Sequence, residues 1–549
     1  MALSLKIRVS LLGLFGLTSF CAAQFPSEPQ GITVLRSRFD NNISISYKEH
    51  LGEPQGYPIN TFFWFFEARN NPENAPLSIY IAGGPGSSSM PALLAENGPC
   101  FVLPDGNSTK PNPWSWNNEV NMLYLDQPVQ VGFSYDVLQN VTKPKLKSCG
   151  AGLVNATDPV PEQNASIRTY PSQNPNSTSL GTRNAAIALW QFSQTWFQEF
   201  PEYHSSRISL ATESYGGRYG PEIFRFFEEQ NQRIRNGSSD VPGETFLLHL
   251  DTLIIINGWV DSLIQWPTQP HIAYNNTYGI ETINATIYQR MLEALDRPGG
   301  CSDQTYECRE AASLYDPTNI GINETVNAIC KAAYDFCFIN LGRLYANSSS
   351  HGFYDYGTLN TDSGPPIIQP FHEAFLNQPH VQSALGVPLN YTGFSLAAWQ
   401  AFSSTGDFQR SGSLDGLAYL LDKGVKVALV YGDRDFVCNW LGGEAVSLAI
   451  NHTDSEHFRH AGYSPIQTNE TYIGGQVRQY DNLSFSRVYE AGHAAAAYQP
   501  ETVHRTFQRA LFNKDIATGA VSTLDGSYTS TGPSDTWAIK NEPPSPRSG

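Results

Sequence analysis

The sequence predicts an α/β fold with a mainly parallel central sheet covered by helices on both faces. Short apolar runs typical of buried strands alternate with helical patterns along the chain. Polar and glycine residues follow directly after the strand-like runs at 77–82, 209–213, 425–431 and 485–489. Because parallel strands end at the same edge of a sheet, these residues are expected to meet there. Candidate site residues at 214, 435 and 493 tie most of the 549 residues into one domain, expected over 24–526.

The first 23 residues predict a signal peptide. Lys6 and Arg8 give a basic start, an apolar run follows from Leu11 to Phe20, and small residues precede Gln24. No later apolar run is long enough to span a bilayer, so no membrane span is expected. We therefore expect a secreted, extracellular protein, with a vacuolar location as the alternative.

The strand-like run 77–82 leads into a glycine-rich loop at 83–89. Glycines let backbone N–H groups approach a developing oxyanion without a side chain in the way. We expect the N–H of Gly84 and that of Tyr215 to form an oxyanion hole. The loop could instead cradle a phosphate, but the Lys-Ser/Thr pair of a nucleotide-binding loop does not follow it.

Ser214 lies where the run 209–213 passes into an amphipathic helix. Such a strand–turn–helix exposes a serine hydroxyl at the sheet edge and requires small neighbours two residues away. Gly216 satisfies the downstream position, whereas Thr212 replaces the usual upstream glycine. Alone, a serine near glycines is as consistent with a turn or a helix cap.

Two later strands end in the residues that a serine nucleophile needs, in the order typical of the α/β-hydrolase arrangement. The run 425–431 ends in Gly432, Asp433 and then Asp435, and the run 485–489 is followed by Gly492 and His493. We interpret His493 as the general base and Asp435 as the carboxylate that orients it. Asp433 remains an alternative for the carboxylate.

The remaining segments suggest how this domain is elaborated. An aromatic stripe between Leu189 and Phe200 indicates a core helix. Residues from about 262 to 370 change to cysteine-bearing helical patterns and predict a lid insertion over the site. Residues 136–180 are polar and predict a surface excursion, and the tail 527–549 is expected to be disordered.

Seven cysteines remain after Cys21 leaves with the leader, so at least one thiol is expected to be free. The spacing of the four cysteines between 301 and 337 suggests nested bridges, 301 with 337 and 308 with 330. Pairing of neighbours is the alternative, and zinc binding is disfavoured by the long spacing and the oxidising compartment. Cys100 and Cys149 are a possible third bridge, which would leave Cys438 free.

Charge and sequons agree with a secreted hydrolase. The formal net charge of −17 and pI near 5.1 argue against nucleic acid as a partner. N-glycosylation sequons are dense enough to predict N-linked glycans; they occur at Asn42, Asn107, Asn140, Asn155, Asn164, Asn176, Asn236, Asn275, Asn284, Asn323, Asn347, Asn390, Asn451, Asn469 and Asn482.

The ordered motifs resemble the secreted serine carboxypeptidase family, in particular its fungal carboxypeptidase S1-like branch. The resemblance covers nearly the whole chain after the leader. It rests on FFWFFE at 62–67, GGPGSSS at 83–89, WSWN at 114–117, DQP at 126–128, VGFSY at 131–135, ESYGG at 213–217, NGW at 257–259, DRDF at 433–436 and GH at 492–493.

This resemblance implies an α/β-hydrolase fold and a serine-type carboxypeptidase that removes C-terminal residues from peptides through an acyl-enzyme. Ser214, Asp435 and His493 would form the catalytic triad, with Gly84 and Tyr215 as oxyanion donors. Glu213 and Gly83 would bind the terminal carboxylate of the substrate, and Cys438 and Ala494 would lie at the pocket for the leaving residue. No cofactor and no metal are implied.

Glu213 also has a physical interpretation. To donate a hydrogen bond to a carboxylate it must be protonated, and proximity to another acid would raise its pKa and favour activity at acid pH. Two departures bear on the substrate. Ala82 stands where the family carries an asparagine that helps hold the terminal carboxylate, and Ala494–Ala497 replace bulkier residues after the histidine.

These departures keep two alternatives open beside a carboxypeptidase. One is an esterase or acyltransferase of the same fold, because an acyl-enzyme can be intercepted by an alcohol and Ala82 relaxes the demand for a terminal carboxylate. The other is a catalytically idle glycoprotein that binds peptides.

Overall fold

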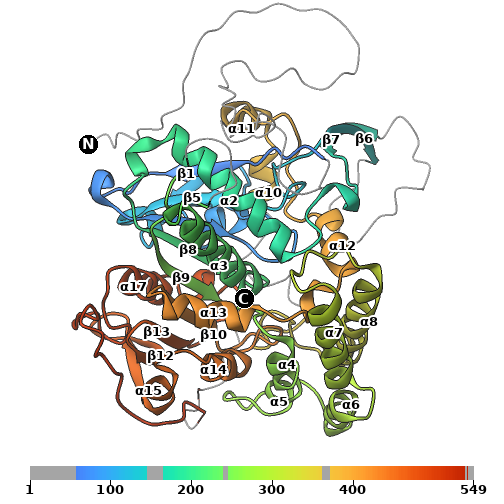
Figure 1. The fold of residues 1–549 in the computed structure, drawn as a ribbon, viewed down its shortest axis with the longest axis vertical. Coiled ribbons are helices and arrows are strands. Elements are labelled where there is room, and N and C mark those ends of the chain that lie inside the picture. Colours follow the sequence, from blue (N-terminus) through green and yellow to red (C-terminus); the bar gives the residue numbers. More distant parts are fainter. Residues whose placement is uncertain (1–56, 145–164, 239–244, 361–370, 538–540, 542–549) are drawn as a thin grey trace, which may run out of the picture.

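The computed structural model describes residues 57–144, 165–238, 245–360, 371–537 and 541. Its centre is a nine-stranded sheet with the order β1-β5-β2-β8-β9-β10-β13-β12-β11 (Figure 1). The strands are β1 (Phe63–Phe66), β2 (Leu77–Ile81), β5 (Asn121–Leu125), β8 (Ile208–Glu213), β9 (Leu250–Ile256), β10 (Lys426–Gly432), β11 (Tyr463–Gln467), β12 (Ile473–Tyr480) and β13 (Leu483–Val488).

The strands from β5 to β13 in this order run parallel, and β1, β12 and β11 add antiparallel edges. The central strands are buried on both faces, which explains why they read as continuous apolar runs rather than alternating ones. The predicted mainly parallel sheet is therefore confirmed.

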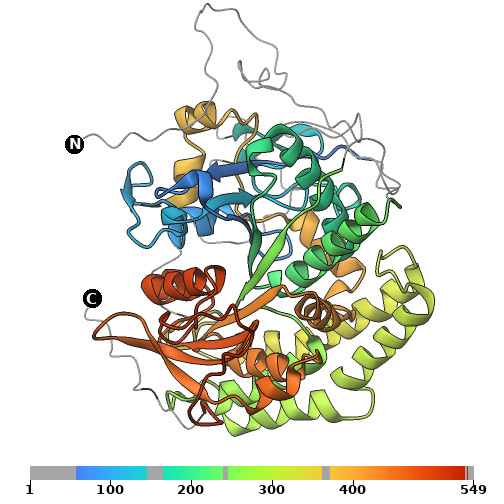
Figure 2. The ribbon, with the colours of Figure 1, turned by 60° about the vertical axis from the view of Figure 1, so that its left-hand side comes forward.

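Helices cover both faces of the sheet. In Figure 2 the red helix α17 (Pro500–Leu511) lies on one side, while the green helices α2 (Thr182–Glu199) and α3 (Gly216–Arg235) lie on the other. Each face has its own apolar core: α2 and α3 contribute to one, and α1 (Met90–Ala95) and α17 to the other. The aromatic stripe of α2, including Trp190, Trp196 and Phe197, is buried in the first core as expected.

Several short helices and two hairpins complete this part of the fold. The helices are α10 (Phe371–Leu376), α11 (Pro379–Leu385), α12 (Leu396–Ser404), α13 (Ser413–Asp422), α14 (Trp440–Ala449), α15 (Ser455–His460) and α16 (Ala495–Tyr498). Two separate hairpins pair β3 (Cys100–Val102) with β4 (Thr109–Pro111) and β6 (Leu138–Pro144) with β7 (Ala165–Pro171). The second hairpin forms part of the surface excursion predicted at 136–180, and residues 145–164 lie outside the described residues.

A helical insertion follows β9. It consists of α4 (Ser262–Gln265), α5 (Thr268–Tyr274), α6 (Ala285–Asp296), α7 (Cys301–Tyr315), α8 (Glu324–Asn340) and α9 (Gly342–Ser348). Disulfides Cys301–Cys337 and Cys308–Cys330 join α7 to α8, so the nested pairing is confirmed and the neighbour pairing is wrong. Cys100 and Cys438 are both free thiols, so the predicted bridge from Cys100 to Cys149, which itself lies outside the described residues, is wrong, while the expected free thiol at Cys438 is confirmed.

The expected disorder of the tail is wrong over residues 527–537. Arg487, buried inside the fold, donates from its guanidinium to the backbone oxygen of Thr536 at 2.8 Å, and Trp537 packs against Trp440. Asn541 also accepts from Arg487, at 2.8 Å. The polar composition suggested disorder, but these polar atoms satisfy a buried cation. Residues 538–540 and 542–549, like the predicted leader at 1–23, lie outside the described residues.

No helix in the described ranges is long and apolar enough to cross a membrane.

Replacing Arg487 by methionine tests how much the buried ion pair contributes to stability. Arg487 lies 3.1 Å from Asp433, and both side chains are inaccessible to solvent. Arg487→Met leaves the carboxyl of Asp433 without its cation, so the free energy of unfolding is expected to fall by about 3–5 kcal/mol in urea denaturation. Arg207→Met removes a solvent-exposed pair with Asp251 and should cost less than about 1 kcal/mol. Equal losses in the two variants would show that burial does not make the Arg487–Asp433 pair more important to stability.

Candidate active site

Ser214 occupies a sharp turn between β8 and α3. Its φ of 61° is in the left-handed region, which a residue with a Cβ adopts only when the surroundings impose it. Backbone hydrogen bonds supply that constraint: the N–H of Ser214 donates to the oxygen of Ile256 at 3.0 Å, and the N–H of Trp259 donates to the oxygen of Ser214 at 2.8 Å. The turn is therefore held by the neighbouring strand β9 and the residues after it.

The structure explains why threonine is accepted at position 212. A Cβ on Gly216 would lie 2.5 Å from Cβ of Thr212, so the glycine makes the room that the larger upstream residue takes. The hydroxyl of Thr212 then donates to the oxygen of Gly216 at 3.0 Å. The departure from the usual small-residue pattern is thus compensated within the turn itself.

His493 and Asp435 meet at the ends of two adjacent parallel strands, β13 and β10. Nδ1 of His493 lies 2.6 Å from Oδ2 of Asp435. The carboxylate of Asp435 is fully buried, and its oxygens also accept from the backbone N–H groups of Val437 at 3.0 Å and Cys438 at 3.2 Å and from Nδ2 of Asn257 at 3.0 Å. This set of donors holds the carboxyl group in one orientation, and its contact with Nδ1 in turn orients the imidazole.

The alternative carboxylate, Asp433, faces a different neighbourhood. It accepts from Arg487 and, at 2.7 Å, from the hydroxyl of Tyr278. Asp435 rather than Asp433 therefore contacts His493.

Cys438 connects the serine to this pair. Its thiol is hydrogen-bonded to the side chain of Ser214, and its sulfur, a nitrogen of His493 and an oxygen of Asp435 lie within 4.8 Å of one another. Burial, followed by the negative charges of Asp435 and Glu213, raises the pKa of the Cys438 thiol well above its usual value. The thiol therefore stays protonated, and it links the side chain of Ser214 to the pair of His493 and Asp435.

The glycine-rich loop after β2 lies directly against the serine turn, because β2 and β8 are paired neighbours. A Cβ on Gly83 would lie 2.5 Å from the backbone nitrogen of Tyr215 and 2.9 Å from Cβ of Ser214. Gly84, the next residue, has a φ of 102°. The loop can approach this closely only without side chains, which brings the two expected oxyanion donors to one edge of the sheet.

Glu213 has a carboxyl partner that the sequence did not reveal. Its side chain is hydrogen-bonded to Glu96, at the end of α1, so at least one of the two carries a proton. Burial is the largest cause that raises the pKa of Glu213 well above its usual value, and the charge of Glu96 adds to it; burial also raises the pKa of Glu96 to about 7. The only sign of this role in the sequence is that Glu96 is an acidic residue directly after the apolar segment Met90–Ala95.

The residues expected at the leaving-residue pocket are nearly inaccessible: Cys438 is 2% and Ala494 1% exposed. Tyr354, a second residue of the site that the sequence analysis did not identify, is more exposed than Cys438 and Ala494. Its ring centre is 5.0 Å from that of His493, its backbone oxygen accepts from the N–H of His493 at 2.8 Å, and about half of the side chain (51%) is exposed. Tyr354 follows the helical insertion and is far from His493 in the sequence, so no local sequence pattern predicted their contact.

Comparisons with known proteins identify the family of this chain. The family model described as serine carboxypeptidase matches residues 47–513. Carboxypeptidase S1 homolog B of Arthroderma otae is 56% identical over 95% of this chain and 84% of its own length, and Carboxypeptidase S1 of Penicillium janthinellum is 33% identical over 84% and 94%.

A solved structure shows the same fold. The prohormone-processing carboxypeptidase Kex1Δp of Saccharomyces cerevisiae superposes with a TM-score of 0.58 at 21% identity, covering 84% of this chain and 89% of that one. The α/β-hydrolase architecture, the strand-end cluster around Ser214 and the match over most of the chain lead to one conclusion: this chain belongs to the serine carboxypeptidase family and is a serine-type carboxypeptidase.

Proposed function

We propose that the enzyme releases C-terminal residues from peptides through an acyl-enzyme formed on Ser214. The 2.6 Å contact between His493 and Asp435, beside a serine held in a left-handed turn, is the observation that supports this most strongly. The hydroxyl of Ser214 attacks the last peptide carbonyl while His493 takes its proton. His493 then protonates the leaving amine, and water hydrolyses the ester by the same route in reverse.

In this mechanism the backbone N–H groups of Gly84 and Tyr215 stabilise the oxyanion of each tetrahedral intermediate. Gly83 keeps the loop close enough to the turn for both to act at once. The buried carboxylate of Asp435 stabilises the imidazolium that forms when His493 accepts the proton.

The pair of Glu213 with Glu96 is suited to recognise the terminal carboxylate of the substrate. Glu213 immediately precedes Ser214, and the raised pKa values keep protons on the pair at acid pH. A protonated carboxyl donates a hydrogen bond to a carboxylate, whereas an ionised one repels it. This assigns the enzyme to acid surroundings, which fits the acidic pI and a secreted, glycosylated protein, with the vacuole as the alternative location.

Ala82 favours a second candidate activity, that of an esterase or acyltransferase. Its backbone N–H donates to the hydroxyl of Ser89 at 3.0 Å, and its methyl group offers the substrate no hydrogen bond. A substrate without a terminal carboxylate loses nothing at this position, so ester cleavage and acyl transfer to an alcohol compete with peptidase activity.

The nucleophile is tested by Ser214→Ala. Because the hydroxyl forms the covalent intermediate, kcat for a blocked dipeptide at pH 5 is expected to fall by about 10⁴-fold or more, with the melting temperature largely kept. Ser88→Ala, a buried serine in the glycine-rich loop, is the control for a general effect of losing a hydroxyl. Activity that persists in Ser214→Ala would contradict the assignment, and an inactive wild type would favour a peptide-binding glycoprotein.

The acid pair predicts a pH dependence of KM. Both carboxyls hold protons at acid pH. Glu96 ionises as pH rises past about 7, and Glu213, whose pKa is raised well above its usual value, loses its proton at higher pH, after which the substrate carboxylate is repelled. KM for a peptide with a free C-terminus should then rise roughly ten- to a hundredfold, while KM for its ethyl ester stays level.

The matched variant is Glu213→Gln, whose amide donates at every pH. Its KM for the free acid is expected to be nearly independent of pH. A pH profile of KM identical to that of the wild type would contradict the role of Glu213.

Reinstating asparagine at position 82 tests the weakened recognition of the carboxylate. Ala82→Asn adds a hydrogen-bond donor to a charged group, so kcat/KM for a free-acid peptide should rise by roughly tenfold. The ethyl ester of the same peptide serves as the internal control and should be unaffected. If the free acid gains nothing, Ala82 is not what favours esters.

A further inference from the structure

We propose that Asp407 is a positioning residue for the oxyanion hole and that it acts through the side chain of Tyr215. This inference rests on the proposed function, because it concerns the residue whose backbone N–H is assigned as an oxyanion donor. Asp407 begins the short 3-10 turn η6 (Asp407–Gln409), far in sequence from the serine turn.

The carboxylate of Asp407 is buried, 2% exposed, and surrounded by donors. The hydroxyl of Tyr215 donates to its Oδ2 in a short hydrogen bond. Thr182, the first residue of α2, donates its hydroxyl at 2.5 Å and its backbone N–H at 3.1 Å, and Nε of Arg218 lies 3.6 Å away. Three hydrogen-bond donors and the nearby cation of Arg218 hold this carboxylate in one orientation.

The side chain of Tyr215 is held at its hydroxyl and along its ring. Burial and the charge of Asp407 raise the pKa of its phenol well above the usual value, so the hydroxyl keeps its proton and remains the donor to Asp407. Its ring meets Phe408 edge-on at 4.5 Å between centres and Tyr219 at 5.1 Å.

A side chain fixed at its tip and along its ring also fixes Cα and the peptide plane that precedes it. That peptide carries the N–H assigned to the oxyanion hole. Such a donor is effective only when it already points at the position that the oxyanion will occupy. Greater freedom of the Tyr215 side chain would therefore lower kcat, although no reacting group is removed.

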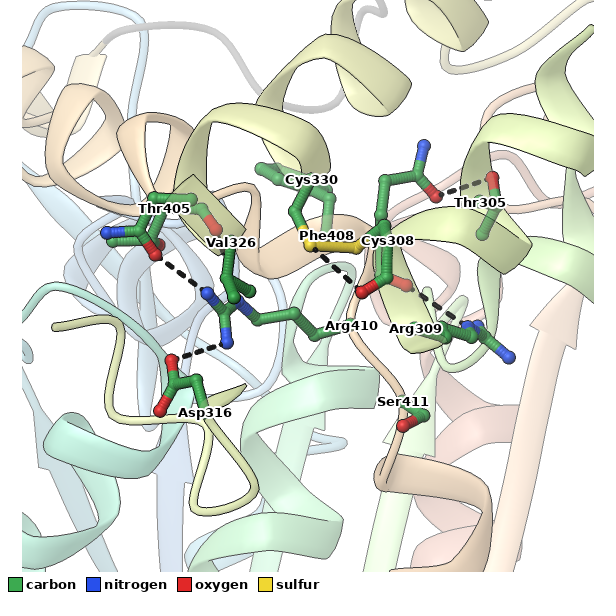
Figure 3. Close-up of a disulfide and its surroundings, with 12 residues drawn as sticks. Thr305, Cys308, Arg309, Asp316, Val326, Cys330, Thr405, Phe408, Arg410 and Ser411 are labelled. Atoms are coloured by element: carbon green, nitrogen blue, oxygen red, sulfur yellow. Dashed lines mark hydrogen bonds and ion pairs between the residues drawn. A yellow bond between two sulfur atoms is a disulfide. The ribbon is translucent and has the colours of Figure 1, made fainter. Parts of the chain in front are cut away.

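The helical insertion packs against the segment that contains Asp407. A Cβ on Gly406 would lie 2.3 Å from the carbonyl carbon of Cys330, so the chain just before Asp407 runs directly against α8 beside the Cys308–Cys330 bridge. Figure 3 shows this disulfide with Phe408 and Arg410 close beside it. Tyr334 of α8 stacks on Phe408 with ring centres 4.4 Å apart.

A buried ion pair closes the other end of the segment. Arg410 is 1% exposed and lies 2.8 Å from Asp316 at the end of α7, a contact that a dashed line marks in Figure 3. Its guanidinium also donates to Asn327 of α8 at 2.7 Å. Its backbone oxygen accepts from Nη2 of Arg218 at 2.9 Å, so the same arginine that faces Asp407 also anchors residue 410. The disulfide-linked helices thus support one continuous set of contacts that ends at Tyr215.

The test combines Asp407→Asn and Tyr215→Phe, neither of which removes a backbone N–H. Both are expected to lower kcat by roughly tenfold with KM within about twofold, because a displaced donor costs less than the 10²–10³-fold of a deleted one. A peptidyl boronic acid forms a tetrahedral adduct on serine, so its inhibition constant should rise by the same factor as kcat falls. The kcat of the double variant should be no lower than that of Tyr215→Phe alone, because both substitutions act on the same hydrogen bond, that between Tyr215 and Asp407.

The matched control is Asp515→Asn. Asp515 is also a buried carboxylate that accepts from a threonine hydroxyl and from backbone N–H groups, at Thr518 and Val521. Its replacement should lower the melting temperature but leave kcat and the boronate constant unchanged. If Asp407→Asn behaves like this control, Asp407 is purely structural and the proposal is overturned.

Two further outcomes separate the inference from the proposed function. If the wild type cleaves only esters, the assignment as a carboxypeptidase of peptides fails, yet a loss of ester kcat and boronate affinity in Asp407→Asn still supports the positioning role. If the wild type neither turns over substrate nor binds the boronate, both proposals are overturned.

Discussion

The proposed active site depends on one contact, the short hydrogen bond between the imidazole of His493 and the buried carboxylate of Asp435. It can form only because β10 and β13 are adjacent parallel strands that end at the same edge of the sheet. Asn257, at the end of β9, donates to the same carboxylate and so brings a third strand into the arrangement. The order of the central strands therefore determines where His493, the proposed base, lies relative to the serine turn after β8.

Several buried carboxyls lie near this edge, and their neighbours give each a different role. Asp433, only two residues from Asp435, is paired with Arg487 and maintains the fold. For Glu213 and Glu96, burial has the largest influence on the pKa of each carboxyl and, with their mutual proximity, keeps a proton between them. The surroundings thus give these neighbouring carboxyls different partners: the guanidinium of Arg487 for Asp433, the imidazole of His493 for Asp435, and each other for Glu213 and Glu96.

The sequence was informative wherever a function depends on residues that are close together in the chain. The serine turn, the glycine-rich loop and the strands ending at Asp435 and His493 all have local patterns. The spacing of the four cysteines favoured the nested pairing, and the structure excluded the pairing of neighbours. Glu96, Asp407 and Tyr354 could not be assigned in this way, because each acquires its role through contacts with residues distant in sequence. The ordered tail was missed for the same reason: the cation that Thr536 satisfies is contributed by β13.

The central claim is that Ser214 is the one hydroxyl activated by the His493–Asp435 pair. The most direct measurement is mass spectrometric mapping of the adduct formed with a fluorophosphonate, in the wild type and in His493→Ala. We expect one adduct per chain, located on Ser214 and strongly reduced without His493. An adduct on a different residue, or labelling of Ser214 that does not depend on His493, would contradict the claim.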